Sequence, residues 1–467
     1  MLQRTLIKDA INKINENILL KGWVDVRRDH GKLIFLDLRD RSGVIQMVIT
    51  PEANQAYKIA ETVRPEWVIE AAGLVSERPE KMKNPDLKTG GIEIKAAELK
   101  ILSSAETTPI DVSGKGDEIS EEARLKYRYL DLRRPRLQKN LRNRHKVAKF
   151  IRDFLTERDF LEIETPILTK STPEGARDYV APSRLHPGKF YALPQSPQQY
   201  KQLLMVSGFE RYFQIARCFR DEDTRGDRQP EFTQVDIEMS FMSQEDILNL
   251  IEEMFCKMIA ELYSDKKITR TPWPRLDYEE TMEKYGSDRP DLRKNKNDSD
   301  ELAFVWIINF PLFEKEKKDG RWAPGHHMFT APKNEDLPKL KTAPGQVRSY
   351  QHDLVLNGCE IGGGSIRIHD SEVQKKIFDL IGFSKKDAAY FEHILTAFKY
   401  GAPPHGGIAP GLDRLLMILE NEPNIREVIA FPKTGDGRDL MMDAPSEISK
   451  EQLVELHLKF VKNKKKR

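Results

Sequence analysis

Two segments of the chain place charged and aromatic side chains where they could hold a nucleotide. Residues 219–236 alternate such side chains at strand spacing around a short charged loop, with Arg220 before the loop and Phe232 after it. Residues 406–414 supply glycines, where a backbone can approach a ligand closely, and end at Arg414. Together these segments predict a site for a phosphate-bearing aromatic ligand.

The residue types in these segments suit the activation of a carboxylic acid by ATP. That reaction brings two anions together, so cations must offset their repulsion and spread the developing charge. The planar fork of Arg220 can engage two oxygens at once, and Glu222 lies on the same strand face, where it could accept a hydrogen bond from adenine. Phe232 offers a stacking face, Arg414 could cover the other side of the base or meet the terminal phosphate, and Gln229 is a further candidate contact.

Two acidic residues further along the chain could hold a magnesium ion. Mg²⁺ prefers oxygen ligands and keeps several waters, so one or two carboxylates beside the phosphates suffice. Asp353 and Glu360 meet this need, and three glycines at 362–364 leave room for a ligand beside the chain. Arg367 then returns a cation near the acids.

The first hundred residues predict a five-stranded barrel. Strands are expected at 18–28, 33–40, 44–49, 67–75 and 92–102, with a helix at 54–62. One helix after the third of five strands is the order of an OB-fold, which commonly binds oligonucleotides on its second and third strands.

The rest of the chain predicts a connector and a larger α+β domain. Residues 105–135 are polar, and we expect a connector whose positive charge at 127–135 is available to an RNA backbone. An amphipathic helix at 141–155 then runs into a strand at 160–166. Further strands are expected at 191–193, 211–219, 231–241, 304–309, 349–356 and 365–367, and helices at 198–207, 244–263, 371–381, 385–399 and 413–419. This order favours a largely antiparallel sheet flanked by helices.

Length and composition limit the class of protein. At 467 residues the chain exceeds one core, and we expect a barrel at 1–104, the connector at 105–135, a catalytic domain at 136–458 and a solvated basic tail at 459–467. The net charge of +2 decides nothing about nucleic acid. No signal peptide or membrane-spanning stretch is found, so a cytoplasmic address is expected. Three scattered cysteines indicate thiols rather than disulfides or zinc ligands.

The motifs together carry a family resemblance. The two nucleotide-binding segments resemble motifs 2 and 3 of class II aminoacyl-tRNA synthetases, and the helix and strand at 141–166 are similar to motif 1. Along nearly its whole length the chain resembles the bacterial-type aspartyl-tRNA synthetases of class IIb. The matching stretches are residues 172–179, residues 195–198 with Lys201, residues 220–223, His326 with His327, the glycines at 362–364 and residues 411–414.

The resemblance implies a homodimer that activates L-aspartate with ATP and Mg²⁺ and charges tRNA(Asp). The implied ATP contacts are Arg220, Asp221, Glu222, Gln229, Phe232, Glu360, Gly411, Leu412, Asp413 and Arg414, of which Arg220, Glu222 and Arg414 are catalytic. The implied aspartate contacts are Glu174, Ser196, Gln198, Lys201, Arg220, Asp236, His326, His327 and Arg367. The implied metal ligands are Asp353 and Glu360. Glu174 would lie on a loop that closes over the substrate.

The barrel would read the anticodon. An aromatic side chain stacks on a splayed base and a polar amide meets a base edge, which suits Phe35 and Gln46, with Arg28 as a phosphate contact. A place for Phe35 in the barrel core is equally compatible with the sequence. His30 favours a type that also charges tRNA(Asn).

Three alternatives are weaker. Asparaginyl- and lysyl-tRNA synthetases share these motifs, but Lys201 and Arg367 suit a dianionic amino acid, which needs two side-chain cations. An OB-fold RNA-binding protein with an inactive second half would not need Arg220 or Arg414. An amide-forming ATP enzyme would not need the barrel. The sequence departs from the family at 289–301, where there is no room for the inserted domain that bacterial-type members usually carry.

Overall fold

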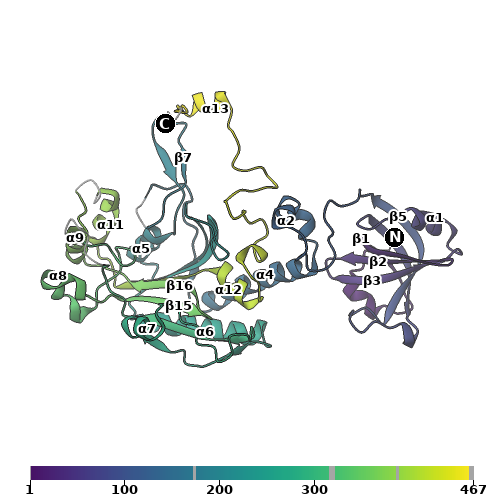
Figure 1. The fold of residues 1–467 in the computed structure, drawn as a ribbon, viewed down its shortest axis with the longest axis horizontal. Coiled ribbons are helices and arrows are strands. Elements are labelled where there is room, and N and C mark those ends of the chain that lie inside the picture. The colour runs from purple at the N-terminus through teal and green to yellow at the C-terminus, as the bar shows by residue number, and fades with distance from the viewer. Residues whose placement is uncertain (1, 172–174, 315–320, 385–388, 462–467) are drawn as a thin grey trace. The chain divides into compact units, whose positions relative to one another are not determined.

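The protein folds into two compact units. A computed structural model describes residues 2–171, 175–314, 321–384 and 389–461. The first unit is Met1–Asp111 and the second is Val112–Arg467. Figure 1 shows the first unit in purple to blue and the second in blue through yellow. Within the described ranges, no helix is both long enough and apolar enough to cross a bilayer.

The first unit is a closed five-stranded barrel. Its strands are β1 (Asn17–His30), β2 (Leu33–Asp40), β3 (Gly43–Ile49), β4 (Val68–Glu77) and β5 (Ile92–Ser103), in the order β1-β2-β3-β5-β4, and helix α1 (Asn54–Thr62) follows β3. Residues of β2 alternate between buried and partly exposed, as a period of two requires when one face packs on a core. The OB-fold prediction is confirmed by this topology.

The second unit is built on an eight-stranded sheet. Its order is β12-β14-β15-β16-β17-β10-β9-β6. These strands are β6 (Leu161–Glu162), β9 (Arg211–Phe219), β10 (Glu231–Ser240), β12 (Arg275–Asp277), β14 (Phe304–Ile308), β15 (Gln351–Leu356), β16 (Cys359–Ile366) and β17 (His405–Pro410). The central pairs are antiparallel, and the two edge pairs, β12 with β14 and β6 with β9, are parallel. The predicted α+β class and largely antiparallel sheet are therefore confirmed.

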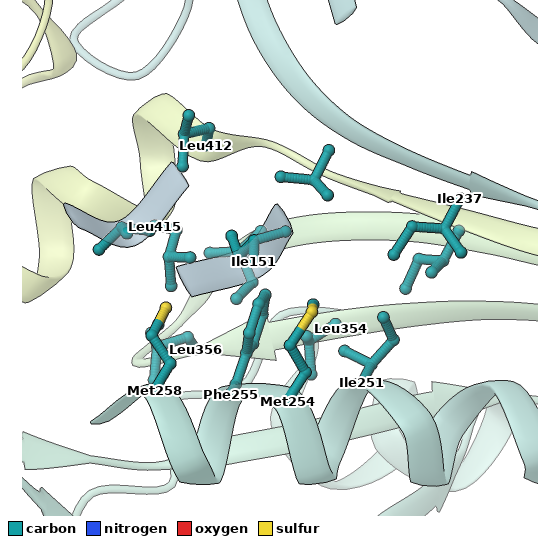
Figure 2. Close-up of a cluster of buried hydrophobic side chains, with 14 of the residues drawn as sticks. Ile151, Ile237, Ile251, Met254, Phe255, Met258, Leu354, Leu356, Leu412 and Leu415 are labelled. Carbon is teal, nitrogen blue, oxygen red and sulfur yellow. The ribbon is translucent and has the colours of Figure 1, made fainter. Parts of the chain in front are cut away.

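Helices flank this sheet. The longer ones are α4 (Pro135–Thr156), α5 (Gln198–Val206), α6 (Gln244–Leu262), α7 (Tyr278–Tyr285), α9 (Ser371–Leu380), α11 (Glu392–Phe398) and α12 (Leu412–Leu419). The shorter elements are α2 (Glu121–Lys126), α3 (Arg128–Asp131), α8 (Lys339–Thr342), α13 (Lys450–Glu455), β7 (Val180–Pro182), β8 (Phe190–Ala192), β11 (Lys267–Ile268) and β13 (Glu301–Leu302). Figure 2 shows Met254, Phe255 and Met258 of α6 pointing at Leu354 and Leu356 of β15. Helices α4, α6 and α12 pack on this face, whereas Lys201 of α5 contacts Asp236 and Glu238 on the other face.

The polar stretch before α4 is a buried part of the second unit. It forms α2 and α3, and Asp131 accepts hydrogen bonds from Arg124, Arg128 and Arg134. Arg124 also forms a bidentate pair with Glu427, at 3.0 and 2.7 Å. Arg128 and Arg134 are 2% and 0% exposed, so the expectation that their charge is available to RNA is wrong. Buried arginines need carboxylate partners, and Glu427 is too far along the chain for its role to be visible in the sequence.

Several elements differ from the predicted ranges. The strand expected at 160–166 is only two residues long, β6. The strand expected at 365–367 is the end of a longer strand, β16, that contains the three glycines. Strand β17 lies at the centre of the sheet and was not predicted, because its glycines and proline show no strand-forming alternation. The first four residues of the helix expected at 385–399 lie outside the described residues, as do residues 462–467 of the basic tail.

Candidate active site

A cavity of about 580 Å³ lies on the sheet face opposite α6. The period of two on β10 points Phe232, Gln234 and Asp236 into the cavity, while Val235 and Ile237 face the hydrophobic core. Most of the predicted site residues line it. They are Ser196, Gln198, Lys201, Arg220, Glu222, Gln229, Phe232, Asp236, His326, His327, Asp353, Glu360, Arg367, Gly411, Asp413 and Arg414.

Two cations share one carboxylate at the base of the cavity. Arg367 donates from Nε and Nη2 to both oxygens of Glu238, at 3.0 and 3.1 Å. The Lys201 Nζ atom lies 3.3 Å from Glu238 Oε2. Burial would raise the pKa of Glu238, but Arg367 and Lys201 outweigh it and the pKa is lowered. Glu238 is therefore a carboxylate that holds both cations in place.

Asp236 offers a buried acceptor at the cavity. Its Oδ1 atom lies 2.6 Å from Lys201 Nζ. Its Oδ2 atom is buried and has no hydrogen-bond partner among the residues that the structure describes. Burial raises the pKa of Asp236 although Lys201 opposes the shift. A buried acceptor without a partner is costly, so a cationic group of a ligand would stabilise this position.

Two histidines complete this part of the cavity in different states. The His327 Nε2 atom is 2.7 Å from Arg367 Nη1, so the ring must accept from the guanidinium. Burial and Arg367 hold the pKa of His327 well below its usual value. Desolvation would lower the pKa of His326, but Asp353, 3.8 Å away, outweighs it and the pKa is raised. His327 is thus neutral beside a cation, whereas His326 can carry charge beside an acid.

Arg220 and Phe232 form a platform at the cavity wall. The Arg220 Cζ atom lies 5.0 Å from the centre of the Phe232 ring, and Nε donates to the Gln195 carbonyl at 3.3 Å. Among the residues that the structure describes, no carboxylate lies within 4.0 Å of the Arg220 guanidinium. Gln229 accepts from the Lys433 backbone at 2.7 Å, and its buried Nε2 has no partner in the described part of the chain. A guanidinium without an acid and an amide donor without an acceptor both suit an anion.

Arg414 closes the opposite side. It donates to the carbonyl of Glu360 at 2.8 Å and to that of Asp227 at 3.1 Å, and forms an ion pair with the Asp227 carboxylate at 3.2 Å. Glu222 pairs with Arg228 at 3.2 Å. These contacts fix Arg414 in the absence of a ligand.

Asp353 and Glu360 form an acidic pair on neighbouring strands. Gln351 donates to Asp353 at 2.8 Å. Burial raises the pKa of Glu360, and Asp353 raises it further. In the described ranges, no group of three or more His, Cys, Asp or Glu side chains could by itself hold a metal ion. Two carboxylates that repel each other fit a divalent cation whose other ligands are phosphate and water.

Glycines bring the backbone of the sheet to the cavity. A Cβ atom on Gly407 of β17 would lie 2.0 Å from the Ile237 carbonyl and 2.2 Å from Glu238 Oε2. A Cβ on Gly364 of β16 would lie 2.2 Å from the Gly407 carbonyl. No side chain fits at either place without moving the strands or the carboxylate that holds the cations.

Other predicted residues have different surroundings. The Leu412 side chain is buried in the hydrophobic core (Figure 2), so only its backbone could face a ligand. Asp413 accepts from the Thr233 backbone at 2.8 Å and thereby ties α12 to β10. Asp221 pairs with the exposed Arg177 at 3.4 Å, outside the cavity lining. Glu174 lies outside the described residues.

The predicted anticodon residues share the outer face of the barrel. Phe35 is partly exposed and lies opposite Arg28 on β1, so it is not a core residue. Arg28 pairs with Asp37 through two hydrogen bonds of 2.6 and 2.8 Å and donates to Gln46 at 3.3 Å. His30 meets the Phe35 ring edge-on at a centroid distance of 5.8 Å. This face combines an aromatic platform with polar groups.

Sequence reasoning missed Glu238 and Gln351. Glu238 stands two residues after Asp236 and therefore on the same strand face, which was the available signal. Gln351 stands two residues before Asp353 and therefore on the same strand face, and its Oε1 atom is buried without a partner among the described residues.

Comparisons with known proteins agree with this geometry. The family model for tRNA synthetases class II (D, K and N) matches residues 120–435, and that for the OB-fold nucleic acid binding domain matches residues 18–102. An aspartate–tRNA(Asp/Asn) ligase of Rubrobacter xylanophilus is 43% identical over 96% of this chain and 95% of its own length. One of Bacillus subtilis is 44% identical over 97% of each. These alignments span 571 and 578 positions, more than the 467 residues here, so both relatives carry segments without a counterpart in this chain.

Solved structures share the fold. The asparaginyl-tRNA synthetase of Pyrococcus horikoshii, in complex with asparaginyl-adenylate, has a TM-score of 0.75 at 21% identity, covering 93% of this chain and 99% of its own. The aspartyl-tRNA synthetase of Entamoeba histolytica has a TM-score of 0.72 at 22% identity, covering 92% and 91%. Since the synthetase model covers more than half of the chain and the relatives align along nearly all of it, the chain belongs to the class II tRNA synthetases of the D, K and N group.

Proposed function

We propose that the protein activates L-aspartate with ATP to aspartyl-adenylate, releases pyrophosphate, and transfers aspartate to the 3′ end of tRNA(Asp). One observation carries this proposal: Lys201 and Arg367 are held together by Glu238, beside the unpartnered Oδ2 of Asp236. The two cations suit a side-chain carboxylate, and the free acceptor suits an ammonium group. The names of the relatives, aspartate–tRNA(Asp/Asn) ligase, support the same substrate.

The remaining cavity residues would bring the two anions together. Arg220, which has no acid within salt-bridge distance among the described residues, would bind the α-phosphate and the substrate carboxylate. Phe232 would stack on adenine, and Glu222 would accept from its amino group. Gln229 would satisfy its free amide donor on the nucleotide. Arg414 would cover the base or meet the terminal phosphate.

Asp353 and Glu360 would hold Mg²⁺. Burial raises the pKa of Glu360 most, and repulsion from Asp353 raises it further. A divalent cation bound between the two carboxylates would remove this repulsion. When bound, the ion would neutralise charge on the phosphates. His326 would orient Asp353 from its other side.

The two cations would also select against asparagine. Glu238 and Asp236 already pair with Lys201 and Arg367, but an amide would supply no anion to the cavity-facing side of these two cations, which are only 1% and 2% exposed. Leaving buried charged donors without their ligand partner costs on the order of several kcal/mol, which is enough to discriminate without an editing site.

The test is the exchange of labelled pyrophosphate into ATP with one amino acid at a time. We expect exchange with L-aspartate and background rates with L-asparagine, L-lysine or no amino acid. Exchange with asparagine equal to that with aspartate would refute the assignment.

We further propose that the barrel reads the anticodon and accepts tRNA(Asn) as well as tRNA(Asp). The contact between His30 and the partly exposed Phe35 supports this, because an aromatic pair at the end of β1 and β2 can stack on an unpaired base. Charging purified tRNA(Asp) and tRNA(Asn) side by side tests it. No aspartate on tRNA(Asn) would contradict the relaxed specificity and leave the activation step unaffected.

We also propose a homodimer that associates through the segment after α4. Leu161 and Leu168 are 49% and 57% exposed there, which is unusual for apolar side chains so close together. Sedimentation velocity should give a species of twice the chain mass of 54.0 kDa. A concentration-independent monomer would contradict this.

A further inference from the structure

A buried hydrogen-bonded chain runs from the cavity wall to a loop behind it. Gln198, which lines the cavity, donates from Nε2 to Gln202 Oε1 at 3.1 Å. Gln202 Nε2 lies 3.2 Å from His405 Nε2, and His405 Nδ1 lies 2.8 Å from the Pro403 carbonyl. Gln198 is 6% exposed, whereas Gln202 and His405 are fully buried. The chain is therefore shielded from water except at its cavity end.

The direction of this chain is set at its far end. A carbonyl can only accept, so His405 must donate from Nδ1 to Pro403. In a neutral imidazole the other nitrogen then accepts, and Gln202 must present its amide N–H group to it. The Gln202 oxygen consequently points at Gln198 and takes the Gln198 N–H group. Gln198 is thereby left with its oxygen as the acceptor that it can present to the cavity.

The surroundings of His405 keep its ring neutral. Burial lowers the pKa of His405, while Glu238 on β10 and the Pro403 carbonyl act in the opposite direction. Arg367 and His369 add to the lowering, and the net shift is downward. The edge of the ring faces Phe398 of α11 at a centroid distance of 6.1 Å. A charged ring would donate from both nitrogens and reverse Gln202.

We propose that Gln202 and His405 are positioning residues that hold the Gln198 amide with its oxygen toward the ammonium group of the amino-acid substrate. The inference rests on the proposed function. An amide can present either end, and its N–H end would repel an ammonium group. The fixed oxygen joins Asp236 Oδ2 to give the ammonium two acceptors on different elements, α5 and β10.

The change Gln202→Met tests the proposal, because methionine keeps the length of the side chain and removes both polar ends. We expect the KM for aspartate in pyrophosphate exchange to rise about ten- to a hundred-fold, as for a lost hydrogen bond to a charged group. The KM for ATP should change less than about two-fold. Gln199→Met on the same helix is the matched control, since Gln199 lines a different cavity. It should leave both constants unchanged.

A second variant distinguishes the loss of this hydrogen bond from a general effect on folding. In Gln202→Glu the carboxylate still accepts from Gln198, and His405 must protonate to face it. Aspartate KM should return to within a few-fold of wild type, and NMR of labelled histidine should show a doubly protonated ring. In the wild type the same spectrum should show the neutral Nδ1–H form.

The outcomes separate the two proposals. A wild type without aspartate-dependent exchange would refute the proposed function, and the histidine spectrum would still test the direction of the chain. An Nε2–H ring in the wild type would overturn the inference. Equal changes of both KM values in Gln202→Met, or no recovery in Gln202→Glu, would overturn it as well.

Discussion

Asp131 is the carboxylate whose removal should cost the most stability. It is fully buried and accepts from Arg124 at 3.1 and 3.2 Å and from Arg128 and Arg134 at 2.7 Å each. In Asp131→Asn the guanidinium groups of Arg124, Arg128 and Arg134 all lose the carboxylate that they share. Breaking a buried pair by removing one partner costs about 3–5 kcal/mol. That is a large part of the total stability of a folded domain, about 5–15 kcal/mol.

Urea unfolding with hydrogen exchange would measure this loss and locate it. The unfolding free energy of the second unit should fall by about 3–5 kcal/mol, with faster exchange in α2, α3 and α4. Peptides of the barrel should exchange as in the wild type, because the barrel has its own core. Asp153→Asn is the control, since Asp153 pairs with Lys149 on the exposed side of α4 and such pairs contribute about 0.3–0.5 kcal/mol. If the two variants lost equal stability, the reasoning would be refuted.

Asp131 should also make the unfolding free energy depend on pH. Burial would raise the pKa of Asp131, but Arg124 and Arg134 outweigh it and the folded-state pKa is lowered. A lowered folded-state pKa means that the stabilisation is complete above the unfolded pKa of about 4 and is lost as pH falls below it. Wild-type stability should therefore decline below about pH 4, and Asp131→Asn should decline less steeply. Parallel curves would contradict this role.

Three further predictions concern the cavity. Arg220→Ala should reduce aspartate-dependent pyrophosphate exchange by at least about a hundred-fold while tRNA binding in a filter assay stays near wild type; wild-type exchange would remove its role. Gly407→Ala should weaken aspartate binding in calorimetry, because its Cβ would meet the Ile237 carbonyl and Glu238, and unchanged affinity would show that the strands adjust. Chelation of divalent ions should stop exchange and added Mg²⁺ should restore it, with Asp353→Asn needing more Mg²⁺ than the wild type; an equal requirement would count against that ligand.

Patterns with a strict period were predictable from the sequence. The strands β2 and β9 and the helix α1 match their predicted ranges, because alternation or helical spacing there reflects one apolar face. The barrel could be inferred from this order alone. Where the local pattern was weak, at β17 or β6, pairing with neighbouring strands decided the structure, and one sequence does not contain that information.

The candidate site divides in the same way. Residues such as Arg220 and Arg367 could be found because their motifs are distinctive, and the structure brings them to one cavity. Glu238 binds Lys201 and Arg367, which approach it from α5 and from the end of β16. This role could not be predicted because it depends on residues distant in the sequence. Likewise, the sequence before α4 predicts solvated arginines, because their partner Glu427 is about 300 residues further along the chain.

The glycines of β16 and β17 have a consequence for the thermal inactivation of the protein. The consecutive glycines of these strands contribute no side chains to packing, so Ile361 and Ile408, which pack against the apolar layer of α6 and α12, do most to keep the strands in order. Inactivation on warming should therefore follow the melting of that layer. An engineer who wished to prolong the working life of the catalyst would improve packing around Met254 and Met258 and leave the reactive surface untouched.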